Sequence, residues 1–143
     1  MAGFLLDTSV LLALGVEDHV HNALAERWLV GVAERFATCP LTQLGFLRIV
    51  KQLRRDLSIH QIGRVLQSIC SDRRHFFIPA DIDVRSADWR LTLGHQQITD
   101  AYLAGLGRQH RLKLRRCAEI TCADCAGLSF ACKAHKVEHS RAM

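Results

Sequence analysis

The sequence predicts an α/β fold in which parallel strands alternate with helices. Short apolar runs begin at positions 4, 36 and 75, and a longer segment follows each of them. In those longer segments apolar side chains recur every three or four residues, as on one face of a helix. Because neighbouring parallel strands need a helical crossover, this alternation indicates helices packed on a parallel sheet.

Length and composition fit one compact domain. The chain has 143 residues, of which 49% are hydrophobic and 23% are charged, as in an ordinary soluble domain with its own core. No apolar run approaches the roughly 18 residues that span a membrane. The first residues lack the basic region and long apolar segment of a signal peptide. We therefore expect a cytoplasmic protein that does not associate with a membrane.

The first predicted strand covers residues 4–6, and an apolar helix begins near residue 10. Asp7 lies at the joint between these two elements. An aspartate in this position is a good helix N-cap. It also stands at the carboxyl end of a parallel strand, where sites form in α/β sheets. Both interpretations of Asp7, as a cap and as a metal ligand, are open at this point.

Two helices and a strand are expected next. The helix within residues 17–36 has Asp18 as its expected N-cap. Its predicted buried side chains are Val20, Leu24, Trp28 and Val32. The second strand covers residues 36–39, and Pro40 suits the first turn of the helix after it. That helix, residues 41–53, is predicted to bury Leu44, Leu47 and Val50.

The alternation continues in the second half of the chain. Ser58 begins a helix whose predicted apolar face is Ile59, Ile62, Leu66 and Ile69. The third strand covers residues 75–78, and a short helix is expected over residues 83–93. The last helix lies within residues 95–112, with Thr99 as its expected N-cap. Its predicted buried stripe is Ile98, Tyr102, Leu103 and Leu106. Another apolar strand should follow, and none is clear in the sequence.

Asp100 lies in the first turn of the last helix and is the second candidate site residue. An acid there is also favoured by the helix dipole, so a purely structural role is the alternative. Two carboxylates about 4–5 Å apart repel by several kcal/mol. Mg²⁺ or Mn²⁺ removes this penalty and can activate water against a phosphodiester. We therefore predict that Asp7 and Asp100 together form a metal site.

Three segments carry a resemblance to a known family: LLDTSVLLAL, ATCPLTQLGFLRIV and QITDAYLAGLGRQHRLKL. In this order and spacing they resemble PIN-domain proteins, in particular the VapC-type ribonuclease toxins of bacterial toxin–antitoxin pairs. The resemblance covers about residues 3–114. It implies a three-layer α/β/α sandwich with a central parallel sheet and a Mg²⁺- or Mn²⁺-dependent endoribonuclease. Asp7 and Asp100 would be its catalytic metal ligands. RNA, a cognate antitoxin protein and a second copy of the chain are the implied partners.

The chain departs from the family pattern at two places. Many PIN proteins have a glutamate where this chain has Gln43, which we regard as a secondary site candidate together with Thr8 and Ser9. Family members also follow the last helix with an apolar strand that ends in an acid. Residues 112–117 of this chain read LKLRRC, without an acid in that register. The rival function is therefore a catalytically impaired PIN-like module that binds RNA or an antitoxin.

The positive charge is concentrated at the end of the chain. Residues 1–100 hold eleven basic and eleven acidic side chains, whereas residues 101–143 hold eight and three. A basic segment suits a polyanion such as RNA, and a solvated tail is the alternative. Within the body of the chain the candidate RNA-binding residues are Arg48, Lys51, Arg54 and Arg55. We predict a domain over residues 1–114 and a divergent, basic tail over residues 115–143.

The predicted tail is also rich in cysteine. Cys117, Cys122 and Cys125 have the spacing of some iron–sulfur proteins. Cys122, Cys125, Cys132 and His135 fit four zinc ligands, which makes a zinc-binding protein a further rival function. An unstructured tail with unrelated cysteines is the third and favoured interpretation. The abrupt change in composition suggests the hypothesis that this segment is frame-shifted.

Overall fold

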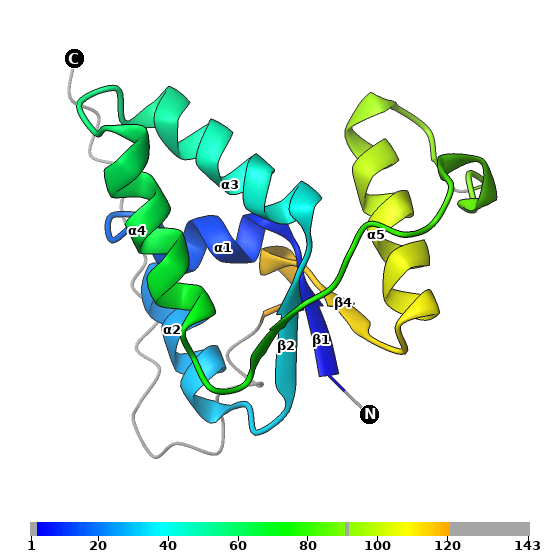
Figure 1. Ribbon diagram of the computed structural model, residues 1–143, viewed down its shortest axis with the longest axis horizontal. Helices are drawn as coiled ribbons and strands as arrows, with labels where there is room; N and C mark the ends of the chain where they lie inside the picture. The colour runs from blue at the N-terminus through cyan, green and yellow to red at the C-terminus, as the bar shows by residue number, and fades with distance from the viewer. Residues whose placement is uncertain (1–2, 91, 121–143) are drawn as a thin grey trace.

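The computed structural model describes residues 3–90 and 92–120, and these form four strands and five α-helices (Figure 1). The strands are β1 (Gly3–Leu6), β2 (Arg35–Thr38), β3 (His75–Phe77) and β4 (Lys113–Arg115). The helices are α1 (Thr8–Gly15), α2 (Asn22–Gly31), α3 (Pro40–Leu53), α4 (Ile59–Cys70) and α5 (Ile98–Gln109). Single 3₁₀ turns lie at Val84–Ser86, His95–Gln97 and Cys117–Glu119.

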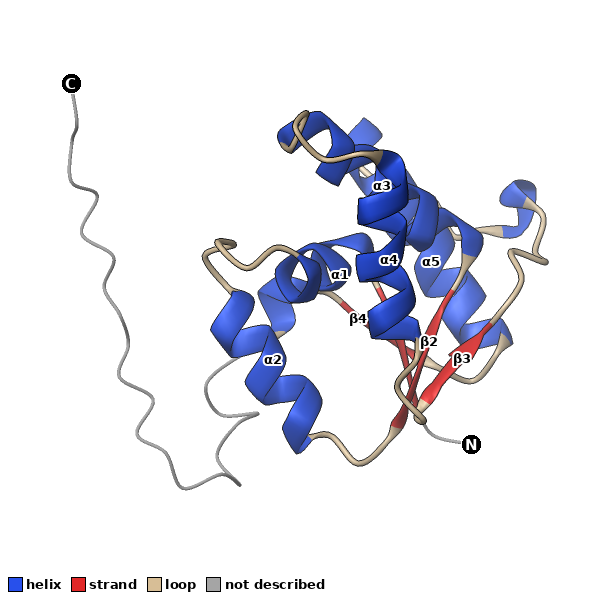
Figure 2. Ribbon diagram, turned by 60° about the vertical axis from the view of Figure 1, so that its left-hand side comes forward, coloured by secondary structure: helices blue, strands red, loops and turns tan. Residues whose placement is uncertain are grey.

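The four strands form one parallel sheet in the order β3-β2-β1-β4. Phe4 of β1 lies opposite Phe36 of β2 on one side and Lys113 of β4 on the other. Helices cover both faces of this sheet (Figure 2). The predicted α/β class and the three-layer α/β/α arrangement are therefore confirmed.

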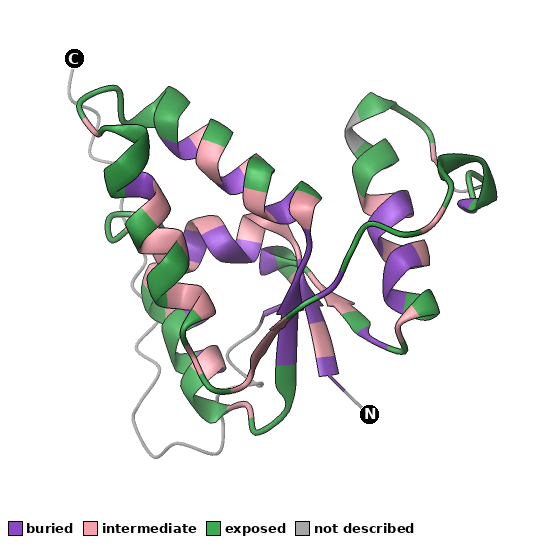
Figure 3. Ribbon diagram, in the orientation of Figure 1, coloured by how far each residue is buried: buried purple, intermediate pink, exposed green. Residues whose placement is uncertain are grey.

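Alternate strand residues supply two separate cores. Side chains of successive strand residues point to opposite faces of a sheet. Leu6 and Phe36 pack against α1, α2, α3 and α4, whereas Leu5 and Ala37 pack against α5. Most of β1 and β2 and the inner sides of the helices are accordingly buried (Figure 3). In the part of the chain that the structure describes, none of the helices combines the length and apolarity needed to cross a bilayer.

Strand β4 corrects the expectation that no strand is discernible after the last helix. It pairs with β1 along its whole length. The sequence pattern does not reveal it because it has only three residues and lies at the edge of the sheet, where none of the three is fully buried. Arg115 extends over the rings of Phe4 and Trp28, with its guanidinium carbon 4.7 and 5.6 Å from their centroids. A cation therefore occupies a position at which an apolar residue was expected.

Helix α2 begins later than predicted. Its N-cap is His21, not Asp18, and Val20 is 73% exposed instead of buried. Residues 16–22 form hydrogen-bonded turns, and the Asn22 side chain donates to the carbonyl of Ala13 at 2.8 Å. This bond fixes the start of α2 against α1, so the preceding residues remain outside the helix.

Helices α3 and α4 begin where predicted, and one predicted core residue in each of them is exposed. Pro40 starts α3 and Ser58 caps α4. Leu44, expected in the core, is 63% exposed, and Phe46 is fully buried in its place. Ile59 is likewise exposed, whereas Ile62 of the same helix is buried. The remaining predicted residues of both helices pack in the core: Leu47 and Val50 of α3, and Ile62, Leu66 and Ile69 of α4.

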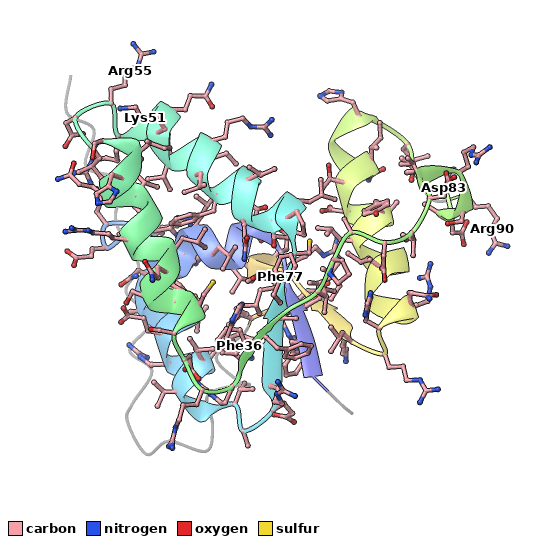
Figure 4. All side chains as sticks on the ribbon, viewed as in Figure 1. Phe36, Lys51, Arg55, Phe77, Asp83 and Arg90 are labelled. Atoms are coloured by element: carbon pink, nitrogen blue, oxygen red, sulfur yellow. The ribbon has the colours of Figure 1, made fainter. Side chains whose placement is uncertain are left out.

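The segment between β3 and α5 is less regular than predicted. Instead of a helix over residues 83–93, the described residues form one 3₁₀ turn, which Asp83 caps through the N–H of Arg85. Asp83 and Arg90 lie in the part of this segment that projects away from the sheet (Figure 4). The N-cap of α5 is Gln97, not Thr99, and Ile98 is exposed because it begins the helix at its solvent end. The other predicted apolar residues of α5 are buried.

The first residues of the predicted tail pack on the domain. Cys117 and Ile120 are buried in the core that α1 and α2 share with the sheet. The boundary at residue 114 stays a prediction. The expectations for Cys122, Cys125, Cys132 and His135, and for an unstructured tail, fall on residues 121–143, which lie outside the described residues.

Candidate active site

The strand order places a crevice at the carboxyl ends of β1 and β4. The chain builds β1, β2 and β3 in one direction and then returns to add β4 on the other side of β1. The helices joined to these two strands, α1 and α5, lie on opposite faces of the sheet. Ligands of α/β proteins bind at such a switch point. Asp7 directly follows β1, and Arg116 directly follows β4.

Asp7 is held in place by the start of α1 and by the turn after β4. One carboxylate oxygen, Oδ2, accepts hydrogen bonds from the N–H of Ser9 at 3.2 Å and from its Oγ at 2.7 Å. Ser9 Oγ in turn accepts from the N–H of Cys117 at 3.0 Å, and the N–H of Asp7 donates to the carbonyl of Arg115 at 2.9 Å. Asp7 therefore caps α1 through Oδ2 alone. The capping role leaves the other oxygen of the carboxylate for a ligand.

Asp100 approaches the same crevice from the first turn of α5. Burial raises the pKa of its carboxyl group, and the negative charge of Asp7 raises it further. Arg116 opposes this shift, with its Nη1 3.7 Å from Asp100 Oδ2. The carboxylates of Asp7 and Asp100 thus interact although the two residues are far apart in the chain. The guanidinium of Arg116 neutralises part of their negative charge.

Arg116 and Glu119 belong to this cluster, although the sequence did not indicate them as site residues. Arg116 donates to Glu119 Oε1 through Nη2 at 2.7 Å and through Nε at 2.9 Å. Burial tends to raise the pKa of Glu119, but these hydrogen bonds outweigh it and the net shift is downward. The available signal was the alternation of Leu112 and Leu114 around a lysine, which is typical of a short strand. Recognising that strand would have placed both residues beside Asp7.

Thr8 and Gln43 make contacts away from the two carboxylates. Thr8 Oγ1 donates to the carbonyl of Thr42 at 3.4 Å, and Thr8 packs closely on Gly45. The side-chain amide of Gln43 donates to Thr38 Oγ1 at 2.9 Å. The same Thr38 oxygen is hydrogen-bonded to His75 Nε2 at 2.8 Å. In the described residues, neither Thr8 nor Gln43 is hydrogen-bonded to Asp7 or Asp100. Ser9 is the secondary candidate that contacts Asp7 directly.

The four basic candidates lie along α3 and just beyond its end. Lys51 and Arg55 lie at the end of α3 that is far from the sheet (Figure 4). Lys51 Nζ donates to the carbonyls of Arg55 and Leu57 at 3.2 and 2.6 Å, and Arg54 pairs with Asp56 at 3.2 Å. Arg48 and Arg55 are exposed. Two of the four side chains thus stabilise the loop between α3 and α4.

The donor set suits a hard divalent cation. Mg²⁺ is commonly held by one or two carboxylates, with water and substrate phosphate completing its shell. Asp7 and Asp100 supply two such carboxylates, and their mutual repulsion favours a cation between them. Between residues 3 and 120, residue 91 apart, no three His, Cys, Asp or Glu side chains are grouped closely enough to hold a metal ion together. The third acid nearby, Glu119, is paired with Arg116.

Comparison with known proteins decides the family. The model of the PIN domain family matches residues 4–115. This chain is a PIN-domain protein. It is 39% identical to ribonuclease VapC29 of Mycobacterium tuberculosis over 106 residues, which are 74% of this chain and 78% of that protein. It is 35% identical to ribonuclease VapC38 of the same organism over 114 residues, 77% of this chain and 81% of the relative. The resemblance expected from the sequence is confirmed.

A solved structure shows the same fold. The crystal structure of Mycobacterium tuberculosis VapC20, described as a Sarcin-Ricin loop cleaving toxin, superposes with a TM-score of 0.61. The superposition covers 90% of this chain and 97% of VapC20 at 13% identity, which supports the fold alone. The family match ends at residue 115. Arg116 and Glu119 lie just beyond the part of the chain that the family model matches.

Proposed function

We propose that this PIN-domain protein is the toxin of a toxin–antitoxin pair and a divalent-metal-dependent endoribonuclease. The observation that carries the proposal is the meeting of Asp7 and Asp100 at the β1–β4 crevice, where the charge of Asp7 raises the pKa of Asp100. The ribonuclease names of its relatives support the same activity. RNA is the substrate, and the partners are a cognate antitoxin protein and a second copy of the chain. The site of action is the cytoplasm.

Each residue of the crevice has a distinct role in this proposal. Asp7 and Asp100 hold Mg²⁺ or Mn²⁺ with their carboxylates. Ser9 fixes the orientation of the Asp7 carboxylate through its two hydrogen bonds. When bound, the cation supplies Lewis-acid stabilisation of the phosphodiester and lowers the pKa of a water molecule. Arg116 balances the charge of Asp100 in the free protein.

Metal dependence tests the proposed activity. We expect the purified protein to cleave single-stranded RNA with Mg²⁺ or Mn²⁺, to stop in excess EDTA, and to recover when Mn²⁺ is restored. The products are separated on denaturing gels. Cleavage that persists in EDTA would overturn the metal-dependent assignment. RNA binding without cleavage in either metal would favour the rival binding module, which the Arg116–Asp100 ion pair also supports.

Replacing Arg116 should strengthen metal binding. In Arg116→Gln the guanidinium no longer competes for Asp100, so we expect Mn²⁺ to bind at least about fivefold more tightly. Titration calorimetry without RNA measures this directly. Arg54→Gln is the matched control, because it removes an equal charge whose partner is Asp56 on the surface. Equal Mn²⁺ affinity of wild type and Arg116→Gln would contradict a role of Arg116 as counter-charge.

A further inference from the structure

A pocket extends from the candidate active site along one side of α5. Its volume is about 310 Å³, and its walls include Thr92, Asp100, Ala101, Ala104, Arg108 and Arg116. Four of these residues lie on α5 at positions that recur on one face of a helix. We call this space the α5 pocket. It opens beside Asp100 and continues to Arg108.

The side chains of α5 explain why the pocket is open. Ala101 and Ala104 place only methyl groups on the face of the helix between Asp100 and Arg108. The rise from Asp100 to Arg108 is about 12 Å, from the helical rise per residue. Leu114 of β4 contributes apolar surface beneath. A ligand in the pocket therefore meets a floor of methyl groups between the Asp100–Arg116 ion pair at one end and Arg108 at the other.

The basic end has a cation that the fold does not use. Arg108 is exposed, and among residues 3–90 and 92–120 its guanidinium has no hydrogen bond or ion pair. Asp88, an acidic residue of the pocket wall, lies close enough to Arg108 for the two charges to interact, but Arg90 holds that carboxylate through hydrogen bonds of 2.7 and 2.9 Å. Arg108 contrasts with Arg116 at the other end, which Glu119 anchors. The guanidinium of Arg108 is thus available to an anion from outside.

We propose that the α5 pocket binds single-stranded RNA, with the nucleotide next to the scissile bond in the pocket and the following phosphate on Arg108. This inference rests on the proposed function, because the scissile phosphate is placed at Asp7 and Asp100. The walls named above carry no aromatic ring on which a base stacks. Recognition therefore depends on the phosphate charge and on shape, which gives affinity without strong base preference. It also differs from the earlier expectation that Arg48, Lys51, Arg54 and Arg55 are the RNA contacts.

RNA binding without metal tests the proposal. A fluorescent single-stranded RNA of about ten nucleotides is titrated in EDTA, so no cleavage occurs, and anisotropy gives the affinity. We expect Arg108→Gln to bind at least about tenfold more weakly, the effect of losing a charged hydrogen bond. The slope of log affinity against log salt should fall by about 0.7, as for one phosphate contact on a single strand.

Two further variants make the result specific. Arg64→Gln removes an equal charge from the exposed side of α4, on the opposite face of the sheet, and should leave affinity and salt slope unchanged. Ala104→Leu fills the pocket without changing charge, so we expect several-fold weaker binding with an unchanged salt slope. Wild-type affinity in Arg108→Gln, or an equal loss in Arg64→Gln, would overturn the proposal. Wild-type affinity in Ala104→Leu would overturn the placement of a nucleotide in the pocket.

The outcome is separable from that of the proposed function. If Arg108→Gln weakens RNA binding but no metal supports cleavage, the α5 pocket is upheld and the nuclease assignment fails. If RNA is cleaved with Mn²⁺ and Arg108→Gln binds as the wild type does, the nuclease assignment is upheld and the α5 pocket fails.

Discussion

Asp7→Asn should abolish metal-dependent RNA cleavage while leaving the stability of the protein nearly unchanged. Asparagine caps helices as well as aspartate does, so α1 keeps its first-turn hydrogen bond from Ser9. The carboxylate charge that attracts a divalent cation is lost. Because disturbing even an outer partner of a metal ligand costs about 10- to 100-fold, we expect the cleavage rate to fall by more than about 100-fold. Rates and thermal melting of the same preparation measure both effects.

Two controls separate the functions of Asp7. Asp7→Ala removes the cap as well as the charge, so it should lose cleavage and also about 1 kcal/mol of stability. Asp83→Asn changes an acid that caps the exposed 3₁₀ turn and should cleave RNA at the wild-type rate. If Asp7→Asn retained more than a tenth of wild-type activity, Asp7 would be a cap and not a metal ligand.

Phe46→Ala should destabilise the protein more than any surface substitution. The ring of Phe46 is fully buried between α1, α3 and α4, and it packs directly on Gly15. Removing a buried phenylalanine leaves a cavity and costs about 3–5 kcal/mol. For a chain of this size, that corresponds to a melting temperature lower by on the order of 10 °C. Urea unfolding followed by circular dichroism gives the free energy of unfolding.

Leu44→Ala is the matched control from the same helix. Leu44 is 63% exposed, so its truncation should change stability by no more than about 0.5 kcal/mol. A loss in Leu44→Ala equal to that in Phe46→Ala would contradict the orientation of α3. The pair also decides between the core expected from the sequence and the core in the structure.

The orientation of α3 shows where sequence patterns lose their power. Leu41, Leu44, Phe46, Leu47 and Val50 are all apolar, so several faces of this helix satisfy the same spacing. Only the position of α3 against α1 selects the face that carries Phe46 and Val50. The starts of α3 and α4 were predictable because Pro40 and Ser58 act within one turn of the chain, whereas α2 and α5 begin at residues other than the predicted ones.

Some residues of the candidate site could likewise be predicted from local sequence, and others could not. Asp7 and Asp100 were identifiable because each lies at a joint whose local sequence marks a strand end or a helix start. Arg116 and Glu119 were not, since their place depends on the pairing of a three-residue edge strand with β1. The α5 pocket depends in addition on the space that the small side chains of Ala101 and Ala104 leave unfilled. Contacts between residues far apart in the chain leave no local sequence pattern from which they can be predicted.

The pairing of the first strand with the last also determines when the site exists during synthesis. Until residues 113–115 have left the ribosome, one edge of β1 has no neighbour, and the crevice beside Asp7 lacks its second wall. Such an unpaired apolar edge is a template for wrong strand pairing. At translation rates of about 5–20 residues per second, several seconds separate the synthesis of β1 from that of β4. A growing chain therefore completes both walls of the crevice beside Asp7 only after β4 has docked.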